Sequence, residues 1–223
     1  PTRRSSDLYS YKALAIVEPG VAMAPQDADL LAVRGIVRMR KGDGEGARAD
    51  GEKAVRLAPG NENAVALLAA LYQRGGRIEA AIALVDRALK ETPRSIDLHL
   101  MLAQMMMATQ RKADAERQLR EVIRLEPGRL AYRYRLAQLQ VELQNVAGAE
   151  ATLREGIALK PEDVEAKLSL AGLLEAHRSV EAATKELQTM SDRAPKDLEL
   201  RLALADFYAR HGDRKSTRLN SSH

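Results

Sequence analysis

The chain has 223 residues with no cysteine, 3% aromatic residues and a formal net charge of +4. The lack of cysteine excludes a disulfide framework and thiolate metal sites. The longest uninterrupted apolar run, residues 64–72, is too short to span a bilayer, so we expect no membrane insertion. Alanine and leucine dominate and β-branched runs are absent, which favours helix throughout.

The two ends differ from the rest of the chain. Residues 1–8 (PTRRSSDL) and 214–223 (RKSTRLNSSH) are rich in serine and arginine and lack the apolar period. Both strings resemble translated sequencing-adapter sequence, so we expect non-native tails; genuine disordered tails are the alternative. The tails carry net charges of +1 and +3, which leaves the interior neutral. The positive net charge of the chain thus comes from its two ends, and we expect no nucleic-acid-binding face.

Six prolines divide the interior at a fixed spacing of 34 residues: Pro25, Pro59, Pro93, Pro127, Pro161 and Pro195. Proline ends a helix because it lacks an N–H donor and clashes with the preceding turn. A helix stop at a constant period indicates an internal repeat. Two residues after each proline stand Asp27, Asn61, Ser95, Arg129, Asp163 and Asp197. All but Arg129 are residue types that cap a helix, at about 1 kcal/mol each.

Each unit is therefore predicted to be a cap, a helix of about 13 residues, a short turn, a second such helix and a proline. Turns are expected at Gly42-Asp43, Gly75-Gly76, Gln144-Asn145 and Gly212-Asp213. The predicted fold class is all-α, with a solenoid over residues 9–213. Its parts are a partial repeat over 9–25, full repeats over 27–59, 61–93, 95–127, 129–161 and 163–195, and the first helix of a further repeat over 197–211.

Small residues recur at equivalent places in these units. In the first helices they are Gly35, Ala69, Ala103, Ala137, Ala171 and Ala205; early in the second helices they are Ala47, Ala81, Ala115, Ala149 and Ala183. A later column holds Ala54, Ala88, Val122, Gly156 and Met190. Small side chains let two helix backbones approach closely. Because Met190 is bulky and Gly51 replaces a large apolar residue, we expect the first and fifth full repeats to be the loosest.

The proline period and the small-residue columns resemble the tetratricopeptide repeat family over roughly residues 27–213. The resemblance implies a right-handed α-solenoid of antiparallel helix-turn-helix repeats with a 34-residue period. It also implies that the first helices line a concave face that commonly binds a partner peptide or helix. One departure is the early aromatic residue of the first helix, which is replaced by Leu31, Val65, His99, Arg133, Lys167 and Arg201.

The resemblance places a mostly apolar groove on the first helices. The predicted partner-binding residues are Leu100, Gln104, Met107, Tyr134, Gln138, Val141 and Leu168. We expect Gln104 and Gln138 to lie adjacent at its centre and Tyr134 to be the main anchor, because interface hot spots favour aromatics. The expected partner is another protein that presents an apolar peptide or helix. A groove that is self-filled or covered by missing segments is the alternative.

No catalytic constellation emerges from the remaining polar residues, and we expect no cofactor and no metal. His177 and His211 occupy the same repeat position, one repeat apart, where a histidine complements the helix dipole. His99 has no cysteine or second histidine at ligand spacing. The glycine-rich stretch at 42–46 lacks the following Lys-Ser/Thr of a phosphate loop.

These observations predict a protein–protein interaction scaffold or adaptor, not an enzyme and not a nucleic-acid-binding array. The Ala/Arg/Leu-rich composition resembles tetratricopeptide proteins of bacterial secretion and exopolysaccharide systems, which implies a bacterial source. Two alternatives stay open. The chain is a non-catalytic arm of a larger enzyme, such as a glycosyltransferase or kinase, or it is part of a secretion or exopolysaccharide assembly. Both the bacterial cytoplasm and the periplasm stay open as compartments.

Overall fold

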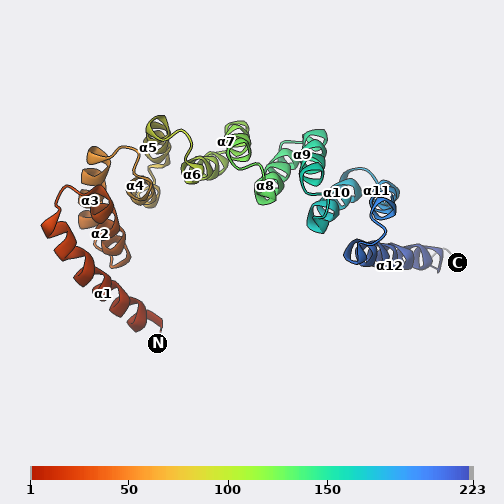
Figure 1. Ribbon diagram of the computed structural model, residues 1–223, viewed down its shortest axis with the longest axis horizontal. Helices are drawn as coiled ribbons and strands as arrows, with labels where there is room; N and C mark the ends of the chain where they lie inside the picture. Colours follow the sequence, from red (N-terminus) through yellow and green to blue (C-terminus); the bar gives the residue numbers. More distant parts are fainter. Residues whose placement is uncertain (1, 221–223) are drawn as a thin grey trace. The chain divides into compact units, whose positions relative to one another are not determined.

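The computed structural model describes the backbone of residues 2–220 and the side chains of residues 9 and 11–211. Within this range helices joined by short turns make up the chain, and there are no strands (Figure 1). It divides into two compact units, Pro1–Leu125 and Glu126–His223. The first holds α1 (Thr2–Met23), α2 (Ala28–Arg40), α3 (Gly44–Leu57), α4 (Glu62–Arg74), α5 (Ile78–Glu91), α6 (Ile96–Ala108) and α7 (Lys112–Leu125). The second holds α8 (Leu130–Glu142), α9 (Val146–Leu159), α10 (Val164–His177), α11 (Val180–Arg193) and α12 (Leu198–Asn220).

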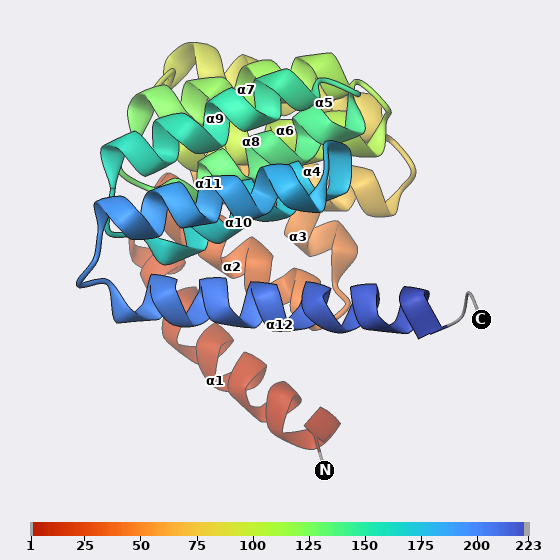
Figure 2. The same ribbon diagram turned by 90° about the vertical axis from the view of Figure 1, so that its right-hand side faces the viewer.

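The order of the helices confirms the predicted all-α repeat solenoid, in which two helices form each repeat. Figure 2 shows the corresponding helices α9 and α11 of the second unit running in similar directions. Helix α1 continues through Pro19, and α12 runs on through the turn expected at Gly212-Asp213. The side chains of residues 1–8 and 214–223 lie outside the described residues. That these ends are non-native tails stays a prediction.

The helix starts confirm the predicted caps. The side chains of five residues accept a hydrogen bond from the backbone N–H three residues further on, at 2.9–3.2 Å: Asp27, Asn61, Ser95, Asp163 and Asp197. Arg129 makes no such bond. The capped N–H groups would otherwise lack partners at the helix ends. The period of the caps therefore sets where each first helix begins.

The turns inside the repeats need a left-handed residue. Gly42 and Gly76 supply it with φ angles of 87° and 70°, and Gln110 and Gln144 adopt it with φ angles of 61° and 60°. The fifth repeat differs, because Arg178 at the equivalent place has a φ of −125°. There α10 has 14 residues, whereas α2, α4, α6 and α8 have 13.

The small-residue columns lie where the helices pack. The alanines that open the second helices are all fully buried: Ala47, Ala81, Ala115, Ala149 and Ala183. Ala54, Ala88 and Val122 of the later column are buried as well, while Met190 is half-buried. Close approach of the helices is thus built on small side chains, as predicted. The core of each unit consists mainly of alanine, leucine and valine.

The position early in each first helix where the family has an aromatic residue is also buried in the first five full repeats. It changes from apolar to polar along the chain: Leu31 and Val65 are followed by buried His99, Arg133 and Lys167. His99 bonds through Nδ1 to Oε1 of Gln118 at 2.7 Å and through Nε2 to the carbonyl of Pro93 at 3.1 Å. Arg133 donates to the carbonyl of Pro127. These bonds give partners to polar groups that burial would otherwise penalise, but Nε of Arg133 has no hydrogen-bond partner among the described residues.

Candidate protein-binding surface

In the first unit, the predicted binding residues lie on one face of α6. Leu100, Gln104 and Met107 follow each other at intervals of four and three residues, so they share a face of the helix. Leu100 is half-buried, Gln104 is exposed and Met107 is 37% exposed. Leu102 and Met105 are buried in the core. This face of α6 therefore presents two apolar side chains and one amide, and their contact with a partner stays a prediction.

In the second unit, α8 repeats the same spacing with Tyr134, Gln138 and Val141. These three side chains line a hollow with a volume of about 210 Å³. The remaining lining comes from the same helix, from α9 and from α10: Ala137, Leu153, Ser169 and Leu173. The structure thus brings three of the predicted residues together in one depression on the first helices α8 and α10.

Tyr134 joins the two hairpins of this unit. Its hydroxyl donates to Oδ1 of Asp163 at 3.2 Å, and Asp163 is also the cap of α10. Burial raises the pKa of the Tyr134 hydroxyl above its ordinary value, and the Asp163 carboxylate raises it further. Both effects disfavour the phenolate. The half-buried ring packs on the core of the unit, so Tyr134 has a structural task besides the predicted anchoring.

Leu168 lies on α10 and is 38% exposed, but it does not line the hollow. Its neighbour Ser169 and the half-buried Leu173 take that place. Gln104 belongs to the first unit and Gln138 to the second. Their adjacency stays a prediction.

The hollow suits an apolar side chain better than a reacting group. Val141, Leu153 and Leu173 provide apolar walls, and Gln138 and Ser169 provide neutral hydrogen-bonding groups. Tyr134 is the one lining residue that titrates, and its hydroxyl is bonded to Asp163. Such a surface can bury an apolar side chain and pair with backbone amides of an incoming segment.

The histidines and acidic residues whose side chains are described form no metal site. Among the described side chains, no group of three or more His, Asp or Glu residues is arranged to hold an ion. Nε2 of His211 lies 3.2 Å from Oε1 of Glu175. None of the described helices is both long and apolar enough to cross a membrane.

Comparison with known protein families identifies tetratricopeptide repeats in this chain. Two models of the tetratricopeptide repeat match the sequence, one over residues 38–105, 76–132 and 106–173, the other over 12–62. Comparison with curated proteins yields no match.

Several solved structures share the fold. The crystal structure of MamA protein is 19% identical, with a TM-score of 0.56, and the match covers 77% of this chain and 94% of that one. A tetratricopeptide repeat protein from Parabacteroides merdae ATCC 43184 is 20% identical, with a TM-score of 0.56 over 86% and 76% of the chains. YrrB, described as a TPR protein with an unusual peptide-binding site, is 16% identical, with a TM-score of 0.57 over 84% and 96%.

Proposed function

Because the chain belongs to the tetratricopeptide repeat family, we propose that it is a non-catalytic scaffold that binds an apolar peptide or helix on the first helices of its repeats. The supporting observation is the hollow lined by Tyr134, Gln138 and Val141, which combines apolar walls with neutral polar groups. The exposed face of α6, with Leu100, Gln104 and Met107, is a second contact surface of the same kind. Leu168 extends the apolar surface on α10.

The mode of binding follows from the chemistry of these surfaces. An apolar side chain of the partner fills the hollow, which removes apolar area from water at roughly 25 cal/mol per Å². The Gln138 amide pairs with a backbone group beside it, which fixes the orientation of the segment. A repeat arm of a larger enzyme would use the same surface, so the proposal holds for both architectures.

The test starts with short random peptides displayed on phage and selected on the full chain. Affinities of the enriched peptides are then measured by fluorescence anisotropy for Val141→Asp and for Ala151→Asp. Val141 lines the hollow, whereas Ala151 is exposed on the second helix α9. A buried, unpaired carboxylate is costly, so we expect Val141→Asp to weaken binding by about tenfold or more and Ala151→Asp to leave it unchanged.

A further variant separates binding from folding at Tyr134. Tyr134→Phe keeps the ring and removes the bond to Asp163, so circular dichroism should show a small loss of stability while peptide affinity stays within about threefold. Failure to enrich any peptide, or equal affinities for wild type and Val141→Asp, would contradict the proposed site.

A further inference from the structure

Helix α12 exposes a face that the other first helices bury. A Cβ added at Gly35 of α2 would stand 3.2 Å from Asp50 Cβ in α3, so this small position faces the second helix of the same repeat. Alanines hold the position in α4, α6, α8 and α10, at 1–5% exposure. Ala205 holds it in α12 and is exposed. On the same face Leu198 is 75% exposed, whereas its counterpart Leu130 in α8 is 6% exposed.

Helix α1 exposes the complementary face. It packs on α2 through Val17, as the second helices pack on the first helix that follows them. Ile16 stands at the position of Asp50 and Leu84, which face the first helix of their own repeats and are 4% and 7% exposed. Ile16 itself is 78% exposed. Within residues 2–220 no first helix precedes α1 and no second helix follows α12, so one face of each helix is uncovered.

We propose that α12 of one copy packs on α1 of a second copy, so that two chains together form the hairpin that each helix lacks on its own. The contact joins a first helix to a second helix, as in the five full repeats. Ala205 and Ala13 take the places of Gly35 and Ala47, which let α2 and α3 approach closely. The exposed apolar side chains of both faces lose contact with water in the pair, which favours association.

The positions that meet also match in size. In the fourth repeat, a Cβ added at Gly156 of α9 would stand 3.3 Å from Arg133 Cδ of α8, so the glycine leaves room for the arginine. The fourth is the one full repeat with glycine at this second-helix position and arginine at this first-helix position. Helix α1 has Gly20 and helix α12 has Arg201 at the same two positions. The pair of α12 with α1 thus repeats a combination that packs within this chain, which favours α1 of a second copy as the partner.

Because the two faces differ, the contact is heterologous. A copy that has bound a partner through α12 still carries an open α1, so further copies add as the concentration rises. The expected product is a head-to-tail series of copies rather than a closed symmetric dimer. Neither α1 nor α12 lines the hollow of the proposed peptide surface, so the two proposals can fail independently.

The test measures the mass of the full chain by sedimentation equilibrium, from micromolar to submillimolar concentration. We expect an average mass that starts at the monomer value of 24.5 kDa and rises past that of the dimer. Ile16→Arg and Ala205→Arg each place a charge in one face, and both positions are exposed in the single chain, so neither change should unfold it. Each should weaken self-association by about tenfold or more. Ala151→Arg, which adds the same charge at an exposed position of α9, is the control and should change nothing.

A mixture of the two variants distinguishes this contact from a symmetric one. Ile16→Arg keeps an intact α12 face and Ala205→Arg keeps an intact α1 face, so the mixture should form a one-to-one complex and stop there. A symmetric contact through α12 would instead leave Ile16→Arg associated by itself. A wild-type chain that stays monomeric throughout, full association of either variant alone, or a mixture without the one-to-one complex would overturn the proposal.

Discussion

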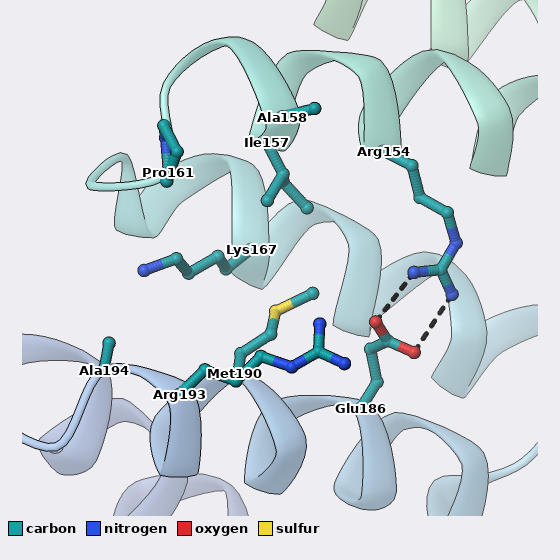
Figure 3. A pocket seen from close by; sticks show the side chains of 9 residues that line it. All are labelled: Arg154, Ile157, Ala158, Pro161, Lys167, Glu186, Met190, Arg193 and Ala194. Atoms are coloured by element: carbon teal, nitrogen blue, oxygen red, sulfur yellow. Dashed lines mark hydrogen bonds and ion pairs between the residues drawn. The ribbon is translucent and has the colours of Figure 1, made fainter.

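Two carboxylates at the same repeat position, Asp50 of the first full repeat and Glu186 of the fifth, have different surroundings. Asp50 is 4% exposed and accepts from Arg34 and Arg38 of its own repeat at 2.6–2.9 Å. The side chain of Glu186 is 24% exposed and pairs with Arg154 of the preceding repeat. Asp50 and its two arginines thus lie within one hairpin, whereas Glu186 and Arg154 line a cavity (Figure 3).

The two repeats also differ in how completely side chains fill the space between their helices. In the first, Gly51 leaves room that Leu68 fills, because a Cβ added at Gly51 would stand 2.9 Å from Leu68 Cδ2. In the fifth, Met190 lines a cavity that stays open. We expected the first repeat to be loosely packed at Gly51. Leu68 instead occupies the space that the missing side chain leaves. A repeat position sets which helices meet, and the adjoining side chains set how well they pack.

The largest effect is expected for Asp50→Ala. This change leaves the part-buried guanidinium of Arg34 without its partner and should lower the free energy of unfolding by about 3 kcal/mol. Urea denaturation measures it. The double variant Arg34→Leu with Asp50→Leu recreates the Leu68 and Leu84 pair of the second repeat and should recover most of the loss. A loss in the double variant as large as in Asp50→Ala would argue against this reading.

Gly51→Leu restores the large apolar residue that the repeat pattern calls for, yet we expect it to destabilise. The new side chain would collide with Leu68, at a cost of roughly 1–3 kcal/mol. Gly172→Leu is the matched control, because a Cβ there meets nothing within 4 Å; better helix propensity should stabilise it by about 0.5–1 kcal/mol. Stabilisation by both changes would show that the first repeat is loosely packed after all.

Met190→Ala should cost about 1 kcal/mol or less, because the half-buried side chain already faces open space. Met105→Ala removes the same atoms from a position that is 2% exposed and should cost roughly 2–5 kcal/mol. Thermal unfolding of both variants compares the two sites. Equal losses would indicate that the fifth repeat is packed as tightly as the core around Met105.

The smallest effect concerns Glu186 and pH. Its hydrogen bonds with Arg154 hold the folded-state pKa below the ordinary 4.5, so the pair stabilises the protein fully above that pH. The contribution is lost as the pH falls through the lower folded-state pKa. Between about pH 6 and pH 3, Glu186→Gln should therefore lose less stability than wild type, by roughly 1 kcal/mol or less for a pair this exposed. Parallel curves for the two proteins would mean that the pair contributes nothing.

The sequence predicted features that repeat at each period. The caps at Asp27 and Asp163, the buried alanines and the outward faces of α6 and α8 all follow from position within a unit. Individual side-chain hydrogen bonds could not be predicted from the repeat period. The bond from Tyr134 to Asp163 and the bonds of His99 depend on side-chain conformations and on the neighbouring helix, which a periodic pattern does not specify.

The most direct test of the central claim maps a selected peptide onto the chain by amide NMR. We expect chemical-shift changes at Gln138, Ser169 and Leu173, which line the hollow on the first helices of the second unit. Changes confined to α9 and α11, with those three amides unaffected, would contradict it.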